Sequence, residues 1–80
     1  MDHSTMNYEW KKITDAHIEG DFAKKDNRTA EVVKFKEYGN TCVVYMYEDN
    51  KYKGSRGYQG EKLAREMAIE YLETGKELWK

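Results

Sequence analysis

Hydrophobic and polar residues alternate with a period of two on both sides of the dipeptide Gly39-Asn40. The runs AEVVKFKEY and TCVVYMYE flank this dipeptide, and both are rich in the β-branched and aromatic residues typical of strands. Glycine in the first central position of a two-residue loop suits a type II′ turn. The pattern therefore predicts a hairpin over 30–48 in which Phe35 faces Val44.

This register divides the hairpin into two faces. The predicted core face holds Val33, Phe35, Cys42, Val44 and Met46. The other face mixes tyrosine with valine and lysine, and consists of Val32, Lys34, Lys36, Tyr38, Val43, Tyr45 and Tyr47. A sheet that faces water on one side has no structural need for aromatic residues there, so these tyrosines are candidates for binding.

A third strand is expected around 51–56, after a turn at 48–51, and its register is open. A two-residue loop at Asp49-Asn50 places Tyr52 and Arg56 on the tyrosine face. A loop longer by one residue turns both side chains inward.

From about Gly60 the apolar period changes to 3.6, which predicts a helix that ends at Thr74-Gly75. Its stripe should pack on the core face of the sheet and consists of Leu63, Ala64, Met67, Ala68, Tyr71 and Leu72. Ile69 falls on the opposite, charged side of this helix. An exposed Ile69 is either an ordinary surface residue or a contact for a partner.

The N-terminal third is less regular. Met6, Trp10, Ile13 and His17 are spaced by 4, 3 and 4 positions, which suits a helix over 7–19 that ends at Gly20. A strand through Tyr8, Trp10 and Lys12 is the alternative, and 21–29 is interpreted as a polar connection. The expected fold is α+β in one domain over 1–80: an N-terminal helix, a three-stranded antiparallel sheet and a C-terminal helix on one face, with flexible tails at 1–6 and 76–80.

Charge and cysteine content restrict the class of protein. Lysine and arginine number 14 against 15 acidic residues, a net charge of −1, whereas dedicated nucleic-acid binders are usually basic. The single cysteine, Cys42, excludes an internal disulfide and fits a reducing compartment. Neither a membrane-spanning run nor a signal peptide is recognisable. We expect a cytoplasmic protein with no membrane contact.

Residues that carry chemistry are scarce. His3 and His17 have no second histidine or cysteine at ligand spacing, so no metal or other cofactor is expected. No serine, cysteine or carboxylate pair stands in an activating context, so the chain is not expected to be an enzyme. The G-x-x-G-x-x-G run over 54–60 either forms an anion site with Arg56 and Lys62 at the helix start, or only permits the bend.

The order helix, three strands, helix resembles the double-stranded-RNA-binding domain over roughly 30–73. The helix that begins Lys62-Leu-Ala64-Arg65 is similar to the Lys-x-Ala-Lys opening of that family's last helix. The resemblance implies that Lys62 and Arg65 bind phosphates. The chain departs from the family where Glu61 replaces the first of two adjacent lysines and Gly60 a serine or threonine. The order of three strands and a helix also resembles plant-type and integrase-arm DNA-binding domains.

Aromatic residues are abundant, with seven tyrosines, two tryptophans and two phenylalanines. A core of this size holds few large rings, so several tyrosines should be exposed, as they are at protein interfaces. We therefore expect a non-catalytic protein that acts by occluding a protein partner. It is similar in size and style to small phage-encoded inhibitors of host nucleic-acid-targeting defence complexes, such as anti-CRISPR proteins, which would place it in a bacterial cytoplasm. The candidate contacts are Tyr45, Tyr47, Tyr52, Arg56, Tyr58 and Ile69.

The alternative function is binding of double-stranded nucleic acid. The candidate contacts are then Lys34, Lys36, Lys53, Arg56, Lys62 and Arg65. A homodimer through an edge strand is compatible with either function, because an open sheet leaves two unpaired edges.

Overall fold

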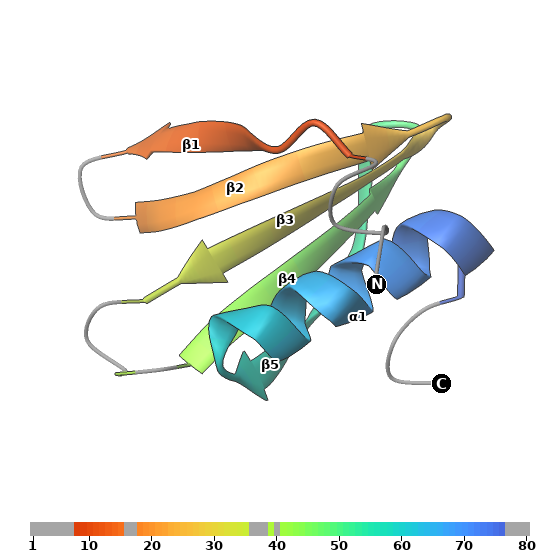
Figure 1. The fold of residues 1–80 in the computed structure, drawn as a ribbon. Coiled ribbons are helices and arrows are strands. Elements are labelled where there is room, and N and C mark those ends of the chain that lie inside the picture. Colours follow the sequence, from red (N-terminus) through yellow and green to blue (C-terminus); the bar gives the residue numbers. More distant parts are fainter. Residues whose placement is uncertain (1–7, 16–17, 36–38, 40, 77–80) are drawn as a thin grey trace.

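The computed structural model describes residues 8–15, 18–35, 39 and 41–76. Within them, five antiparallel strands form one sheet in chain order and a single helix follows (Figure 1). The elements are β1 (Lys11–Asp15), β2 (Ile18–Lys25), β3 (Arg28–Lys34), β4 (Thr41–Glu48), β5 (Lys51–Gln59) and α1 (Glu61–Thr74). The α+β class is confirmed. Of the expected tails, all but Lys76 lies outside the described residues.

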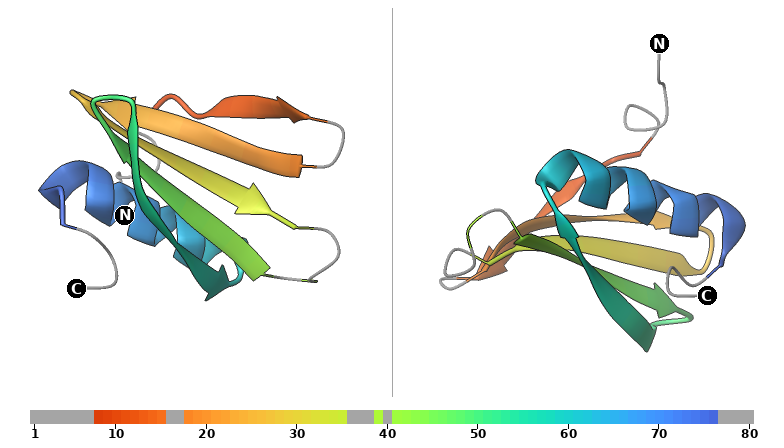
Figure 2. Two further views of the ribbon diagram at one scale, coloured as in Figure 1. Left: turned by 180° about the vertical axis from the view of Figure 1, so that it is seen from behind. Right: turned by 90° about the horizontal axis from the view of Figure 1, so that it is seen from below.

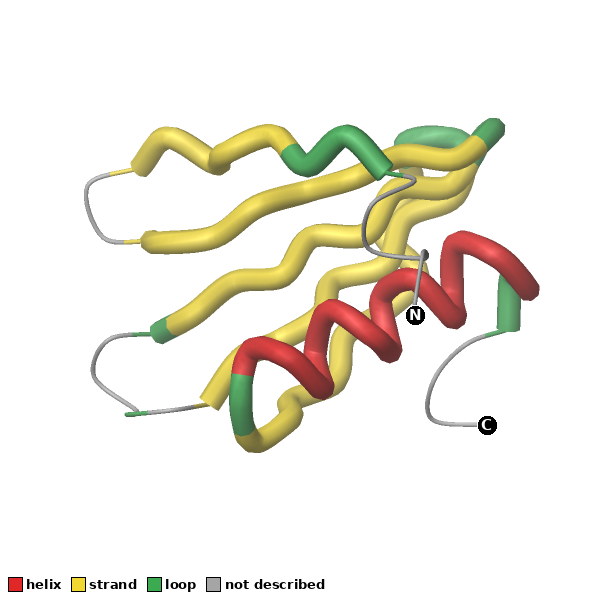
Figure 3. The backbone as a smooth tube through the Cα atoms, in the orientation of Figure 1, coloured by secondary structure: helices red, strands yellow, loops and turns green. Residues whose placement is uncertain are grey.

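The expected N-terminal helix and the expected three-stranded sheet are wrong. Strands β1 and β2 occupy this part of the chain (Figure 3). The two strands pair with each other, and Ile13 lies opposite Gly20. Helix-like spacing of a few apolar residues is a weak signal, and the β-branched and aromatic residues Ile13, Ile18 and Phe22 favour extended backbone. The supposed polar connection over 21–29 contains most of β2, a tight turn and the start of β3.

The pairing of β3 with β4 also differs from the expected register. Val32 lies opposite Val44, and Lys34 lies opposite Cys42. The link between the two strands is the longer segment 35–40 rather than a two-residue turn. As a result the alternation predicted for β4 is correct, whereas β3 presents its other side: Val32, and not Phe35, faces the helix.

Helix α1 covers one face of the twisted sheet and lies mainly over β3 and β4 (Figure 2). Ala64 and Ala68 of the helix, together with Ala23 and Ala30 of the sheet, are at most 1 % exposed. These small side chains allow the helix to approach the strands closely. The helix ends at Gly75, as predicted, where φ is 74° and the Gly75 N–H donates to the Tyr71 carbonyl at 2.7 Å.

The buried side of α1 is rotated from the expected stripe. Leu63 is 44 % exposed, whereas Ile69 is only 5 % exposed, so the expected surface position of Ile69 is wrong. The chain before β1 explains this burial. Residues four positions apart share one side of a helix, and Ile69 lies four positions from both Arg65 and Glu73.

Both of these neighbours contact the segment 8–10. The Arg65 guanidinium lies 4.7 Å from the Trp10 ring centroid, and the Tyr8 hydroxyl donates to Glu73. Segment 8–10 therefore covers the side of α1 on which Ile69 lies. Burial and the hydrogen bond to Glu73 raise the pKa of Tyr8 to about 12, so its hydroxyl remains a donor at neutral pH.

Candidate functional site

The face of the sheet that points away from α1 carries five of the nine aromatic residues in the described part of the chain, and Tyr52 among them is exposed. Successive side chains of a strand point to opposite faces, so the strand register assigns each residue to a side. We call this side the open face. Its apolar, aromatic and acidic positions include Ile13, Phe22, Glu31, Val33, Phe35, Val43, Tyr45, Tyr47 and Tyr52, and Lys11, Lys24 and Thr29 lie on it as well. The view from behind shows that no helix among the described residues lies over it (Figure 2).

Three tyrosines form a cluster at the β4–β5 hairpin. Tyr52 is 58 % exposed, and its ring centroid lies 5.8 Å from that of Tyr47 and 6.4 Å from that of Tyr45. The rings are tilted by 59° and 45°, a geometry in which aromatic pairs attract one another. The cluster is thus a packed arrangement of rings on the protein surface.

Glu31 is an acidic residue that lies among the aromatic side chains of the open face. It lies opposite both Phe22 and Tyr45, and accepts a hydrogen bond from the Tyr47 hydroxyl at 3.2 Å. Burial raises the pKa of Tyr45 and Tyr47, and the Glu31 carboxylate adds to this effect. The phenols therefore stay neutral and can donate hydrogen bonds.

Two hollows on the open face meet at Glu31 and Tyr47. The larger, about 310 Å³, is lined by Phe22, Lys24, Thr29, Glu31, Tyr47 and Asn50. The smaller, about 150 Å³, is lined by Ile13, Glu31, Val33, Phe35, Tyr45 and Tyr47. Rings and a carboxylate thus surround concave surface, as in the pockets that receive side chains at protein interfaces.

Strand β5 divides the predicted contact residues between two faces. The turn at Asp49-Asn50 places Tyr52 opposite Tyr47 as expected, but a bulge beside Met46 and Tyr47 then shifts the register. Arg56 consequently lies opposite Val44 on the helix side, where its guanidinium is 5.8 Å from the Tyr58 ring centroid. Of the two registers that the sequence left open, neither holds along the whole strand, because Tyr52 lies on the tyrosine face and Arg56 on the helix side.

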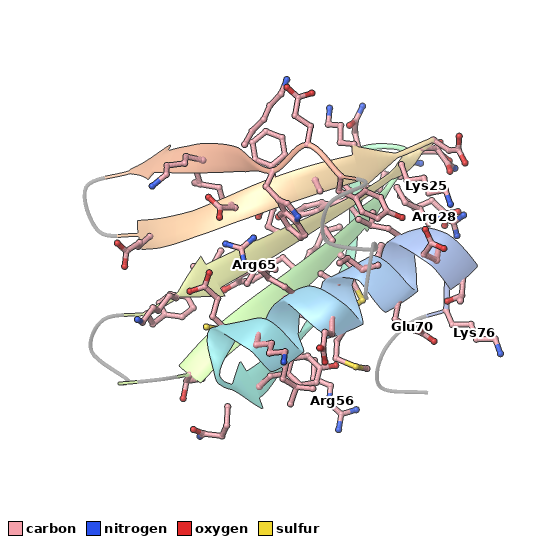
Figure 4. All side chains as sticks on the ribbon, in the orientation of Figure 1. Lys25, Arg28, Arg56, Arg65, Glu70 and Lys76 are labelled. Atoms are coloured by element: carbon pink, nitrogen blue, oxygen red, sulfur yellow. The ribbon has the colours of Figure 1, made fainter. Side chains whose placement is uncertain are left out.

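A polar groove of about 560 Å³ lies on the helix side and is lined partly by Lys12, Glu19, Asp21, Lys34, Cys42, Glu61 and Arg65. Arg65 points from α1 toward the sheet (Figure 4) and forms ion pairs with Asp21 and, at 2.8 Å, with Glu61. Burial lowers its pKa, but the hydrogen bonds to these two carboxylates outweigh burial, so the pKa of Arg65 is raised above its ordinary value. Burial also raises the pKa of Cys42, so this thiol is protonated at neutral pH.

The described residues among those predicted to bind nucleic acid are distributed over β3, β5 and α1. Lys34 and Arg65 line the groove, Lys62 is exposed on α1, and Lys53 is exposed on β5 beside the bulge. Arg56 lies on the helix side, and Lys36 lies outside the described residues. The G-x-x-G-x-x-G run is mostly strand β5 rather than a loop, with positive φ at Gly54 and Gly60.

Sequence reasoning missed Phe22, Glu31 and Phe35 as parts of the open face. A usable signal was present: Asp-Asn occurs at 26–27 as well as at 49–50. Both pairs form two-residue turns between strands, and Asp26, like Asp49, has a φ of 56°. Treating the first pair as a hairpin turn would have placed Phe22 on a strand next to the hairpin.

Comparisons with known proteins leave the chain without an assigned family. No protein-family model matches it, and neither curated proteins nor solved structures give a significant match. The helix in the described part of the chain is too short and too polar to cross a membrane. Over the same residues, no three histidine, cysteine, aspartate or glutamate side chains gather as metal ligands would.

Proposed function

We propose that this chain is a non-catalytic binding protein that holds a protein partner on its open face and acts by occlusion. The observation that supports this most is the gathering of Tyr45, Tyr47 and Tyr52 with Phe22 and Phe35 on the face that α1 leaves uncovered. Burying such rings in a partner contributes both hydrophobic area and ring contacts. Tyrosine is also among the residues enriched where interface energy concentrates.

Charge placement supports a protein partner over a nucleic acid. The open face has the Glu31 carboxylate near its centre, where it would repel a phosphate backbone. On the helix side, Arg65 is held by Asp21 and Glu61, so its charge is already compensated. Lys34 lines the same groove as Arg65 and three carboxylates, those of Glu19, Asp21 and Glu61, which interrupt the positive surface there.

The biological role we propose is inhibition of a host nucleic-acid-targeting complex, in the manner of small phage-encoded inhibitors. A twisted sheet backed by a helix is a rigid platform, and a bound platform can block a partner's working surface without chemistry. The arrangement also leaves β1 and β5 as the sheet edges. Self-association through one of them stays a prediction that the oligomeric state in solution will test.

The proposal is tested by affinity capture from a bacterial lysate. We expect the wild-type chain to retain a discrete protein, and Tyr45→Ala combined with Tyr52→Ala to retain about tenfold less. Leu63→Ala is the matched control, because it removes exposed apolar surface from α1 on the other side of the molecule. Equal capture by the tyrosine variant and the wild type would contradict the proposal.

Nucleic-acid binding is measured in parallel with duplex RNA and DNA at ~50 mM salt, where electrostatic binding is strong. We expect no salt-sensitive binding. Tight binding that weakens steeply with salt, and that Lys62→Glu combined with Lys53→Glu abolishes, would favour the alternative function.

A further inference from the structure

The smaller hollow on the open face has an unusual composition. In the part of the chain that the structure describes, its lining combines Glu31 with the apolar or aromatic residues Ile13, Val33, Phe35, Tyr45 and Tyr47. A carboxylate amid apolar side chains loses favourable hydration and is stabilised only by hydrogen bonds or an opposite charge. The Tyr47 hydroxyl supplies one such bond at 3.2 Å, whereas an ionised carboxylate has about four acceptor positions.

Among the residues that the structure describes, the lining of this hollow includes no basic side chain. Lys24 lines the larger neighbouring hollow together with Glu31, but not the smaller one. Residues that lie opposite Glu31 on the adjacent strands are Phe22 and Tyr45, which are both uncharged. The hollow therefore combines a carboxylate with ring surfaces, and the described part of its lining supplies no cation to balance the charge.

We infer that the smaller hollow receives an arginine side chain of the protein partner, a role that rests on the proposed function. A guanidinium can form parallel hydrogen bonds to a carboxylate while its plane stacks on aromatic rings. Cations are attracted to the faces of tyrosine and phenylalanine rings within about 6 Å of the ring centre. Glu31, Tyr45, Tyr47 and Phe35 present both kinds of contact in one place.

Other occupants fit the hollow less well. A phosphate group would meet the negative charge of Glu31 without a compensating cation in the described lining. An uncharged apolar side chain would cover the carboxylate and offer it no donor beyond the Tyr47 hydroxyl, which costs free energy. A second copy of this chain could also occupy the hollow. In that case the resonances of the open face would change with protein concentration in the absence of any probe.

The experiment uses the wild-type chain, with N-acetyl-arginine methylamide as the probe. Binding is followed by proton–nitrogen correlation NMR spectra of the backbone amides at millimolar probe concentrations. We expect saturable shifts of the Glu31, Val33 and Tyr45 amides. N-acetyl-citrulline methylamide, which has nearly the same shape but no charge, should bind about tenfold more weakly. Lysine and phosphate probes test the preference for a guanidinium and for a cation.

Two variants locate the effect. Glu31→Gln keeps the size of the side chain and should weaken arginine binding about tenfold. Glu66→Gln, an exposed acid on α1, removes the same charge elsewhere and should leave binding unchanged. The amide spectrum of each variant shows whether it keeps the wild-type fold; if Glu31→Gln does not, Tyr45→Leu and Phe35→Leu test the ring contacts instead.

The inference is overturned if the arginine and citrulline probes shift the same amides equally, or if Glu31→Gln binds arginine as the wild type does. It is likewise overturned if the open-face resonances change with protein concentration alone, which would assign the hollow to a second copy. Loss of partner capture in the tyrosine variant with full capture by Glu31→Gln would overturn this inference and leave the proposed function standing. Full capture by the tyrosine variant would instead remove the proposed function.

Discussion

Replacing Ile69 by alanine tests how α1 sits on the sheet. The side chain is 5 % exposed and lies on the side of α1 where Arg65 contacts Trp10 and Glu73 contacts Tyr8. Truncating a buried isoleucine to alanine costs about 2–5 kcal/mol. We expect a value near the lower end, about 2–3 kcal/mol, because the covering segment is short and can settle into part of the space left behind.

Such a loss is large for this chain. A domain of this length is stable by about 4–12 kcal/mol, and each kcal/mol corresponds to about 4–8 °C in melting temperature. The measurement is urea unfolding followed by far-ultraviolet circular dichroism, with thermal melting as a second readout. We expect the midpoint to fall by ~10–20 °C in the melt, with little change in the urea slope.

Leu63→Ala is the control on the same helix. Leu63 is 44 % exposed, so its truncation should cost about 0.5 kcal/mol. If instead Leu63→Ala proves more destabilising than Ile69→Ala, then the helix faces the sheet with the stripe expected from the sequence, and the described packing is refuted.

Three further substitutions test individual contacts, each by urea unfolding. Gly75→Ala should lower the free energy of unfolding by about 1–2 kcal/mol. The φ of Gly75 is +74°, a conformation that L-residues rarely adopt, and an added Cβ would lie 2.1 Å from the Arg28 guanidinium. No loss of stability would show that the helix end rearranges. Tyr71→Phe should cost about 1 kcal/mol, because the Tyr71 hydroxyl donates to the Tyr47 carbonyl at 2.8 Å, and an unchanged stability would mean that water replaces this donor. Hydrogen bonds from Tyr8 and Lys25 hold the pKa of Glu73 below its usual 4.5, so its stabilisation is present above that pH and is lost as the pH falls through the folded-state pKa. The difference in stability between wild type and Glu73→Gln should accordingly shrink in acid, and a pH-independent difference would contradict the described contacts.

The helix and strand β4 could be predicted from the sequence because local signals there agree. The 3.6-residue period and Gly75 define α1, and strict alternation places Cys42, Val44 and Met46 on the helix side. The bend at Asp49-Asn50 was also predictable, since both residues tolerate the positive φ that the turn requires. In each case the deciding interaction is local in the sequence.

The errors arose where non-local pairing decides. The β3–β4 register depends on which residues pair across the segment 35–40, and one misplaced turn inverts a whole strand. The face of the sheet on which Arg56 lies depends on a bulge beside Met46. No pattern of residues in the sequence indicated this bulge. Ile69 is buried because a distant segment packs on it, and a helical period alone does not record such a contact.

The candidate site was predicted in part. Tyr45, Tyr47 and Tyr52 do lie together, as the alternation and the two-residue turn indicated. Arg56 and Tyr58 belong to the opposite face, and Glu31 and Phe22 entered the site only through strands that the sequence reading had not recognised. Which rings share a face is a property of the complete sheet.

The central claim, that the open face binds a protein partner, is tested most directly by site-specific photo-crosslinking in a bacterial lysate. A benzoyl-phenylalanine replaces Tyr52 in one variant and Leu63, on α1, in the other. We predict that irradiation joins the Tyr52 variant to a discrete protein and that the Leu63 variant gives no such product. A specific product from the Leu63 position, with none from Tyr52, would contradict the account and move the binding surface to the helix.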